Sequence, residues 1–276
     1  MINLVRYAKL MDIAAKDGHT IGIPRASWLF VPGNRPERFA KAAASGAAEV
    51  VLDLEDAVAP GEKSAARDAV VNYLEHRQAW VRVNAADTNW YQDDLAAISL
   101  PGLKGVVLPK AENLEAIERI DSQVIALIES AWGLEHIREL ARGTVRLAFG
   151  SLDYALDIGA EHTDENLQYA RATLVHVSRI SNLPAPIDGI TTEIRDGRVI
   201  AAEARRSRER GFSAKLCIHP VQIAPVEEAF APHATEREWA RRVMAAMASA
   251  GSGVALLDGR MIDKPVLDRA VRILEY

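Results

Sequence analysis

Carboxylate side chains follow several β-like apolar runs of the sequence, at the point where each run ends. Glu55 and Asp56 come directly after the run VVLDL. Glu129 follows VIALI, and Asp153 stands just past RLAFG. Acids at the ends of parallel strands gather at one face, and Mg²⁺ is commonly held by one or two carboxylates together with substrate and water. The pattern therefore predicts a metal-assisted enzyme that acts on a carboxylate-bearing substrate.

Eight apolar runs of strand length alternate with amphipathic stretches rich in Ala, Glu and Arg. The predicted strands are 27–32, 49–55, 79–84, 105–110, 124–129, 146–150, 185–190 and 214–219. The amphipathic stretches include 35–45, 62–77, 112–120, 133–142, 165–182 and 198–210. Strands that alternate with helices predict parallel pairing, and continuous apolar runs fit strands covered on both faces. Eight such units over roughly 200 residues favour a (β/α)₈ TIM barrel.

A doubly wound open sheet is the alternative α/β fold. Such a sheet usually carries a glycine-rich phosphate-binding turn after its first strand. The first turn of this chain is VPGNRPERF, which has one glycine and two prolines. This turn therefore favours the barrel.

The segments outside the barrel predict two extensions. Residues 1–24 are expected to form an N-terminal extension, 25–220 the barrel, and 221–276 a C-terminal helical extension. Within the last segment, helices are predicted over 221–230, 235–250 and 265–275, and the stretch GSGVALLDGRMIDKP is predicted to be a loop. We expect this helical arm to contribute to an oligomer and to close over a barrel mouth, either its own or that of a neighbouring subunit.

Composition and charge limit the kinds of partner. The net charge of −5 gives no reason to expect nucleic-acid binding. No apolar run approaches the ~20 residues of a transmembrane helix, and the N-terminus does not resemble a secretion signal. The single cysteine, Cys217, cannot form an internal disulfide, which fits a reducing compartment. We therefore expect a cytoplasmic protein that acts on small molecules and has no membrane partner.

Several longer motifs occur in a specific order along the chain. They are RASWLFVPG, LDLEDAV-x-P-x-x-K-x-x-AR (52–67), VRVN, LPKAE, IESAWG, GSLD, KLCIHP and DGRMID. With these motifs the chain resembles the citrate lyase β-subunit-like (CitE-like) branch of the HpcH/HpaI aldolase superfamily, from about Arg25 to Ala270. The resemblance implies a (β/α)₈ barrel, usually assembled as a homotrimer or a hexamer. It also implies a Mg²⁺-dependent lyase that cleaves or forms a carbon–carbon bond in a hydroxy-di- or tricarboxylic acyl thioester.

The resemblance also implies roles for three residues of the predicted site. Glu129 and Asp153 match the metal ligands of the family, with Mg²⁺ as the expected ion and Mn²⁺ as the alternative. This sequence has GSLD where many relatives have a second acid just before the aspartate. Arg82 matches a substrate-contacting arginine, and a guanidinium suits a carboxylate or a developing enolate oxygen. Structural alternatives remain: each acid could cap the helix that follows it, and Arg82 could pair with Glu55.

Two further groups of acids are candidates for catalysis. Glu55 and Asp56 could hold metal-bound water or Arg82, or could act directly. The resemblance implies that Asp263 reaches into the site of a neighbouring subunit and serves there as an acid/base. The alternative for Asp263 is an N-cap, because an aspartate followed soon by proline often opens a helix.

The first predicted turn carries candidate substrate-binding residues. Pro32 and Gly33 end the first strand, and Arg35 and Arg38 follow within a few residues. The arginines could neutralise the phosphates of coenzyme A, or could simply lie on a solvated helix face.

Two residues near the last predicted strand are interpreted as structural. His219 is expected to close that strand, and Cys217 is expected to be a core residue. No flanking base or helix N-terminus argues for a lowered pKa of the Cys217 thiol.

The expected reaction is a retro-Claisen cleavage of a malyl-, citramalyl- or citryl-type acyl-CoA thioester into acetyl-CoA and a 2-oxo acid. One alternative is a citrate lyase β subunit that acts on an acyl-carrier-protein thioester. Another is a malate-synthase-like thioesterase, and a third is a catalytically silent binding subunit. The sequence leaves these alternatives open because pocket shape depends on loop geometry.

Overall fold

The computed structural model describes residues 26–250 and 254–275. The chain divides into two compact units. The first is Arg25–Phe230, and the described part of the second is 231–275. The predicted N-terminal extension, 1–24, lies outside the described residues.

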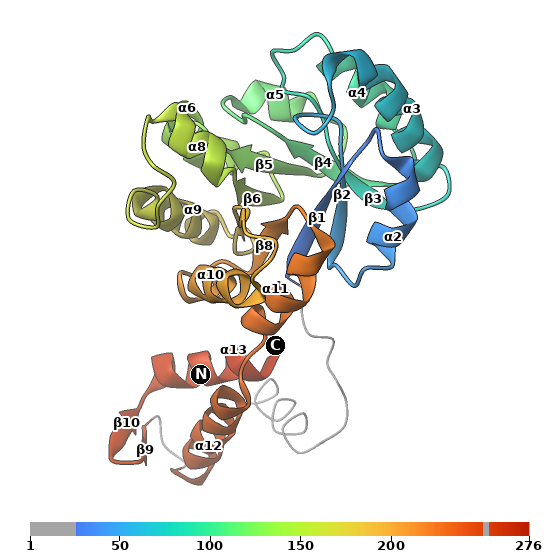
Figure 1. Cartoon of the computed structure of the whole chain (residues 1–276). Helices are drawn as coiled ribbons and strands as arrows, with labels where there is room; N and C mark the ends of the chain where they lie inside the picture. Colours follow the sequence, from blue (N-terminus) through green and yellow to red (C-terminus); the bar gives the residue numbers. More distant parts are fainter. Residues whose placement is uncertain (1–25, 251–253, 276) are drawn as a thin grey trace. The chain divides into compact units, whose positions relative to one another are not determined.

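The first unit is a closed barrel of eight parallel strands in which each strand pairs with the next along the chain (Figure 1). The strands are β1 (Ser27–Pro32), β2 (Glu49–Asp53), β3 (Ala79–Arg82), β4 (Leu103–Leu108), β5 (Val124–Ile128), β6 (Arg146–Phe149), β7 (Ile187–Asp188) and β8 (Ala214–Cys217). Pairing of β1 with β8 closes the barrel. The predicted (β/α)₈ fold is confirmed.

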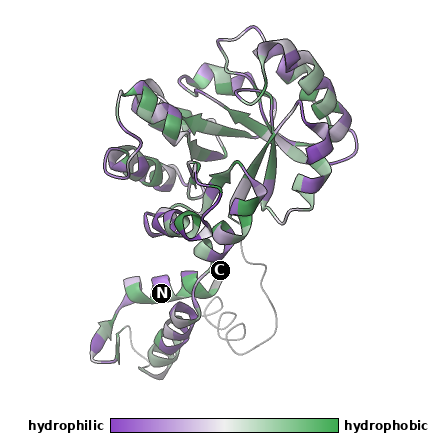
Figure 2. Ribbon diagram, viewed as in Figure 1, coloured by the Kyte–Doolittle hydropathy of each residue, from purple (hydrophilic) through white to green (hydrophobic). Residues whose placement is uncertain are grey.

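Apolar side chains fill the barrel interior, and the strands are the most hydrophobic part of the ribbon (Figure 2). One buried cluster takes members from all eight strands: Trp28, Val51, Trp80, Val107, Ile125, Leu127, Ala148, Ile187, Ala214 and Leu216. The rings of Trp28 and Trp80 lie 5.3 Å apart within it. Large residues in this cluster fill the space between the strands, so functional groups are left to the strand ends.

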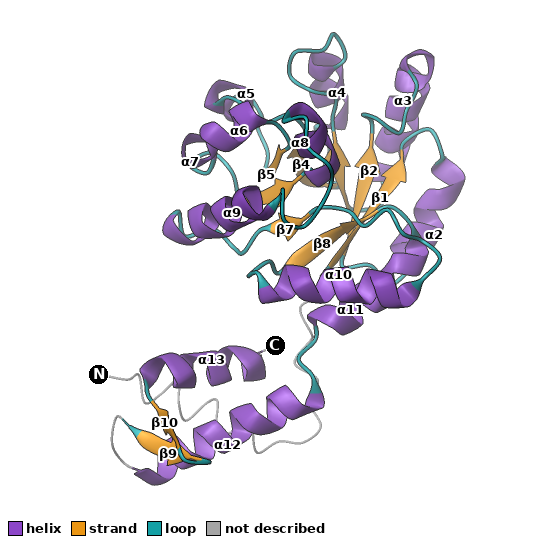
Figure 3. Cartoon of the chain, turned by 60° about the vertical axis from the view of Figure 1, so that its left-hand side comes forward, coloured by secondary structure: helices purple, strands orange, loops and turns teal. Residues whose placement is uncertain are grey.

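Helices surround the strands (Figure 3). They are α2 (Phe39–Ala43), α3 (Lys63–Leu74), α4 (Tyr91–Ile98), α5 (Leu114–Glu118), α6 (Ala131–Glu135), α7 (Ile137–Leu140), α8 (Ser151–Asp157), α9 (Gln168–Ile180), α10 (Gly197–Glu209) and α11 (Ile223–Phe230). Single 3₁₀ turns lie at η1 (Pro36–Arg38), η2 (Pro60–Glu62) and η3 (Pro220–Gln222). Helix α11 packs on α10 and β1, so the first helix after β8 belongs to the barrel unit.

The second unit contains α12 (Ala234–Ala250), β9 (Ala255–Leu257), β10 (Arg260–Ile262) and α13 (Lys264–Glu275). Its two helices pack on each other around Val243, Met244 and Ala270, all of which are fully buried. The expected helices are present. Among the described residues, no helix combines the length and the apolar character needed to cross a bilayer.

The prediction of a loop over 251–265 is wrong for its central part. Strands β9 and β10 pair antiparallel there, with Leu257 opposite Arg260. The two residues between them, Asp258 and Gly259, both have positive φ, at 52° and 73°. An Asp-Gly pair between short strands is a strong hairpin signal, because such a two-residue turn requires positive φ at both positions.

Candidate active site

A cavity of about 430 Å³ lies at the carboxyl ends of the barrel strands, where barrel enzymes place their chemistry. Five of the predicted site residues line it: Pro32, Asp56, Arg82, Glu129 and Asp153. Apolar residues, among them Phe30, Phe149 and Ile190, form much of the remaining wall. The structure therefore brings the predicted acids and the predicted arginine into one largely apolar space.

Glu129 follows β5 directly and is only 4% exposed. Its Oε1 accepts a hydrogen bond of 2.7 Å from the backbone N–H of Lys110, whose φ of 46° turns that N–H toward the carboxylate. Burial, with the nearby Glu55 carboxylate, raises the pKa of Glu129 from 4.5 to about 8. Ser130 caps the helix that follows, so Glu129 does not serve as the cap.

Asp153 lies in the first turn of α8, two residues after the start of the helix. The N-cap of α8 is Gly150, so Asp153 is not the cap. Burial, and then the Asp56 carboxylate, raise the pKa of Asp153 above its usual range. A Cβ at Gly150 would lie 2.4 Å from Oε2 of Glu129, so a glycine is needed where the α8 turn passes that acid.

The donor chemistry of this pair fits Mg²⁺. Two buried or half-buried carboxylates with raised pKa values share one cavity, and a cation between them would favour their charged forms. Within residues 26–250 and 254–275, no cluster of three or more His, Cys, Asp or Glu side chains is arranged to hold a metal ion. Mg²⁺ is commonly bound through one or two carboxylates, with waters and substrate at the other positions, so two ligands suffice.

Arg82 ends β3 and is held in a rigid position. Its Nε and Nη2 donate to the two carboxylate oxygens of Asp53, both at 2.7 Å, and its Nη1 lies 2.9 Å from Oε2 of Glu55. The guanidinium also stacks 4.7 Å from the centre of the Phe30 ring. Burial opposes the charge of Arg82, but Asp53 and Glu55 outweigh it and raise the pKa of the guanidinium. Arg82 therefore pairs with barrel acids and lines the cavity at once.

Glu55 and Asp56 differ in their surroundings. The Glu55 side chain is buried, and its Oε1 lies 3.8 Å from Nζ of Lys110. Burial raises the pKa of Glu55 to about 7, against the effect of Arg82. The side chain of Asp56 is 61% exposed and lies 4.0 Å from Arg82. Glu55 therefore supports the guanidinium, whereas Asp56 faces the cavity.

Three residues to which the sequence assigned no catalytic, substrate-binding or metal role hold the site together. Asp53, at 1% exposure, forms the fork with Arg82, and Lys110 supplies the backbone donor to Glu129. Lys63 is buried, and its Nζ donates at 2.7 Å to the carbonyl oxygens of Leu54 and Glu55. The lysine of the LDLEDAV-x-P-x-x-K motif was the available signal for this last contact.

The first turn follows Pro32, which lines two adjoining cavities. Gly33 donates its N–H to the Asp53 carbonyl at 2.7 Å, and a Cβ there would lie 2.9 Å from that oxygen. Arg35 is half-exposed, pairs with Glu37 at 2.6 Å and does not line the first cavity. A second cavity of about 440 Å³ shares Phe30, Pro32 and Ile218 with the first, and Arg38 and Lys41 line it.

Three other predicted residues have structural contacts. Asp263 lies in the C-terminal unit, where its Oδ1 accepts a hydrogen bond of 3.3 Å from the N–H of Val266, as an N-cap would. The His219 side chain caps η3. Cys217 is buried, and burial raises the pKa of its thiol to about 12, which fits a core residue.

Comparison with known proteins gives a consistent result. The model of the HpcH/HpaI aldolase/citrate lyase family matches residues 26–220. A citrate lyase subunit beta-like protein of Mycobacterium tuberculosis is 38% identical over 257 residues, which cover 90% of this chain and 93% of the relative. An L-malyl-CoA/beta-methylmalyl-CoA lyase of Cereibacter sphaeroides is 31% identical, with 87% and 90% covered.

Solved structures show the same similarity. The crystal structure of the protein CitE of Mycobacterium tuberculosis, in complex with magnesium, acetoacetate and coenzyme A, superposes with a TM-score of 0.82 at 36% identity. The match covers 91% of this chain and 97% of that one. A second structure of CitE, with magnesium and pyruvate, gives a TM-score of 0.74 at 32% identity.

Proposed function

This chain belongs to the HpcH/HpaI aldolase/citrate lyase family and is a lyase, and we propose that it cleaves a hydroxy-di- or tricarboxylic acyl-CoA thioester with Mg²⁺. The products would be acetyl-CoA or a homologue and a 2-oxo acid. One observation carries the proposal: the carboxylates of Glu129 and Asp153, both with raised pKa values, share a cavity with a rigid, permanently charged Arg82.

Glu129 and Asp153 would hold the metal ion. When bound, Mg²⁺ acts as a Lewis acid that makes the substrate hydroxyl easier to deprotonate and steadies the carbonyl group that forms. The N–H of Lys110 fixes the direction of the Glu129 carboxylate through its hydrogen bond to Oε1. The apolar wall formed by Phe30, Phe149 and neighbouring residues would reduce contact with water, which would strengthen charge interactions inside the cavity.

Arg82 would stabilise the charge that develops on the thioester. The hydroxyl group loses its proton, and the bond between the hydroxyl carbon and the carbon next to the thioester breaks. The electron pair of that bond passes to the thioester, whose enolate oxygen would receive hydrogen bonds from Arg82, and protonation of the enolate carbon completes the acyl product. Because Asp53 and Glu55 already fix the guanidinium, little reorganisation is needed as the charge forms.

A carboxylate must exchange the proton in this scheme. Asp56 is the exposed acid of the cavity, and we also propose Asp263 of a neighbouring subunit for this role, on the basis of the family resemblance. The second role requires the homotrimer or hexamer that the resemblance implies. Sedimentation of the purified protein measures that assembly, and a monomer at micromolar concentration would exclude Asp263 as the acid/base.

The cavity lined by Arg38 and Lys41 would accept the phosphates of coenzyme A. It adjoins the first cavity through Phe30, Pro32 and Ile218. A substrate with its thioester carbonyl beside Arg82 could therefore extend its coenzyme A portion toward Arg38 and Lys41. Relatives support this assignment: one CitE structure holds coenzyme A, and another relative is a malyl-CoA lyase by name. Arg35 is the less suitable phosphate ligand because it is paired with Glu37 at 2.6 Å, whereas Arg38 lies 3.9 Å from the same carboxylate and lines the second cavity.

A substrate screen tests the proposal. The purified protein is incubated with malyl-, citramalyl- or citryl-CoA and Mg²⁺, and the 2-oxo acid is measured as its phenylhydrazone. We expect turnover of at least one thioester, its loss with EDTA, and its loss in Glu129→Gln. Glu118→Gln, an exposed glutamate on α5, is the matched control and should keep wild-type activity.

Two other outcomes have separate meanings. Release of free coenzyme A without a 2-oxo acid would favour thioester hydrolysis instead of cleavage. Silence on all three thioesters, with the matching acyl-carrier-protein thioesters also unreacted, would refute the lyase proposal and favour a binding subunit.

A further inference from the structure

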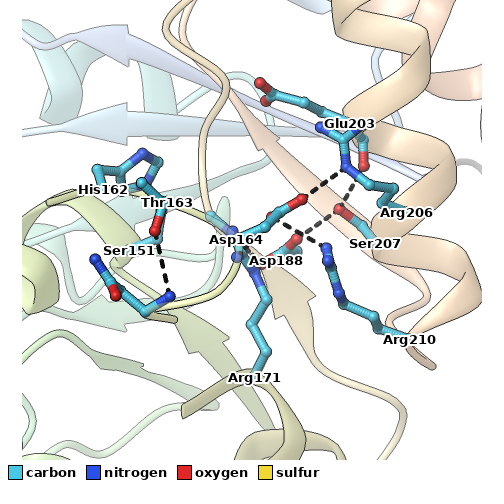
Figure 4. Close-up of polar contacts among 12 residues, drawn as sticks. Ser151, His162, Thr163, Asp164, Arg171, Asp188, Glu203, Arg206, Ser207 and Arg210 are labelled. Carbon is cyan, nitrogen blue, oxygen red and sulfur yellow. Dashed lines mark hydrogen bonds and ion pairs between the residues drawn. The ribbon is translucent and has the colours of Figure 1, made fainter. Parts of the chain in front are cut away.

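The connection between α8 and α9 is anchored by a cluster of charged side chains outside the proposed active site (Figure 4). Asp164, on this connection, accepts from Arg171 at 3.1 Å and from Arg210 at 3.2 Å. Arg206 lies 2.8 Å from the other carboxylate oxygen of Asp164. The Asp164 carboxylate thus links its loop to arginines of α9 and of the C-terminal end of α10.

The cluster continues into the barrel wall. Arg171 is only 6% exposed, and its Nε donates at 3.1 Å to Asp188 at the end of β7. Asp188 in turn accepts from Ser207 of α10 and from the backbone N–H of Gly189. Lys215 of β8 donates to the Gly189 carbonyl at 2.7 Å. Because several of these partners are buried, the cluster fixes the loop against a rigid base.

His162 connects this anchored loop to the first turn of α8. Its Nε2 lies 3.0 Å from Oγ of Ser151, the first residue of that helix. Ser151 is 1% exposed and lines the proposed active-site cavity. A Cβ at Gly189 would lie 2.2 Å from the same Oγ, so Ser151 is tightly enclosed. Asp153 follows Ser151 by two residues in the same turn.

We propose that His162 is a positioning residue for the metal site, acting through Ser151 to fix the first turn of α8 and so the carboxylate of Asp153 next to Glu129. Asp164 and its arginines hold the loop that carries His162. This inference rests on the proposed function, because it assumes that Glu129 and Asp153 bind the metal.

The protonation state of His162 supports an uncharged hydrogen bond between its ring and the Ser151 hydroxyl. His162 is exposed, but partial desolvation, and then the positive charge of Arg171, lower the pKa of its ring, so the neutral ring is favoured at neutral pH. A neutral ring exchanges one hydrogen bond with a hydroxyl group without adding charge next to the metal ligands. A side chain that can either donate or accept at the Nε2 position, such as the amide of glutamine, should therefore replace it.

Metal binding to the unliganded protein tests the proposal. Mn²⁺ affinity is measured by electron paramagnetic resonance on metal-free wild type and on variants whose thermal unfolding is normal. Loss of a direct partner of a metal ligand costs roughly 10- to 100-fold in affinity, and His162 acts one contact further away. We therefore expect His162→Ala to weaken Mn²⁺ binding about five- to tenfold and His162→Gln to stay within about twofold of wild type. His176→Ala, at an exposed position on α9, is the matched control and should bind as wild type does.

A double-variant comparison separates positioning from a general loss of packing. Ser151→Ala removes the same hydrogen bond from its other end. The double variant with His162→Ala should therefore bind Mn²⁺ no more weakly than the poorer single variant. Turnover at saturating Mg²⁺ should change less than the Mg²⁺ concentration that gives half-maximal activity.

The outcomes distinguish this inference from the proposed function. If wild type itself fails to bind Mn²⁺, the metal assignment of Glu129 and Asp153 fails. If wild type binds Mn²⁺ and Glu129→Gln does not, the metal assignment is supported. Wild-type Mn²⁺ affinity in His162→Ala would then overturn only the positioning role of His162. Additive losses in the double variant, or equal losses in His162→Gln and His162→Ala, would overturn it as well.

Discussion

Replacing Glu129 with glutamine should stabilise the metal-free protein at alkaline pH while it abolishes metal binding. Glu129 is 4% exposed, and its ionised form lies near the carboxylates of Glu55 and Asp153. Glutamine has nearly the same shape, and its amide oxygen can still accept the hydrogen bond from the N–H of Lys110. The substitution therefore removes the buried charge and leaves the local structure in place.

The magnitude follows from the pKa of Glu129, which rises from 4.5 to about 8 on folding. Between these values the native state binds more protons than the unfolded state, so the free energy of unfolding falls as the pH rises. The cost is absent below pH 4.5 and complete above about pH 8. At about 1.4 kcal/mol per pKa unit, the rise from 4.5 to about 8 corresponds to roughly 5 kcal/mol as an upper bound.

Urea unfolding in the presence of EDTA measures this effect, with tryptophan fluorescence as the signal, because Trp28 and Trp80 lie in the barrel core. The free energy of unfolding of Glu129→Gln minus that of wild type should grow between pH 5.5 and pH 8.5 by roughly 2–4 kcal/mol. Glu118→Gln should show no such growth. A difference that stays constant with pH, or that shrinks, would refute the assignment of a raised pKa to Glu129. Saturating Mg²⁺ should stabilise wild type and leave Glu129→Gln unchanged.

Three further substitutions test the supports of the site. Arg82→Lys should lower kcat/KM at least ~100-fold, measured on the thioester that reacts, because an ammonium cannot reproduce the fork that Asp53 fixes; a loss below fivefold would contradict this role. Gly150→Ala should weaken Mn²⁺ binding more than ~10-fold by pressing on the metal-binding carboxylate, whereas Gly61→Ala, with open space around it, should bind normally. Lys63→Met should lower the urea midpoint by an amount equal to about 1–3 kcal/mol, since the Leu54 carbonyl loses its lysine donor and the Glu55 carbonyl keeps only the N–H of Val58; an unchanged midpoint would exclude that support.

The strands were predictable from the sequence because each is a continuous apolar run between polar segments. The prediction of 185–190 was too long: β7 contains only Ile187 and Asp188. Pro184 and Pro186 precede it, and a proline lacks the N–H that a central strand needs for its ladder. The hairpin in the C-terminal unit was missed although its signal, Asp258–Gly259, was present, because its strands are only three residues long.

The acids of the site and the pairing of Arg82 with Glu55 were predictable, whereas the geometry of the other contacts that hold them was not. An acid after an apolar run marks the end of a strand, and this rule places Glu129 and Asp153 at one face of a barrel. The fork between Asp53 and Arg82 depends instead on the register between β2 and β3, which sets these two residues side by side. Register results from packing of the whole barrel and leaves no local mark in the sequence. The positive φ of Lys110 is equally hidden, because lysine gives no sign of that conformation.

The balance of charge in the cavity connects stability with function. Arg82 is already engaged by Asp53 and Glu55, and the side chain of Lys110 is 53% exposed, so neither cation neutralises the buried Glu129. Burial, together with the neighbouring carboxylates, therefore raises the pKa values of Glu129 and Asp153. A bound divalent cation would offset this effect by favouring both ionised forms, and this requires release of protons when metal binds below pH 8. Protons therefore compete with the metal ion for Glu129 below pH 8, and relief of carboxylate repulsion adds to metal affinity only where the site is ionised.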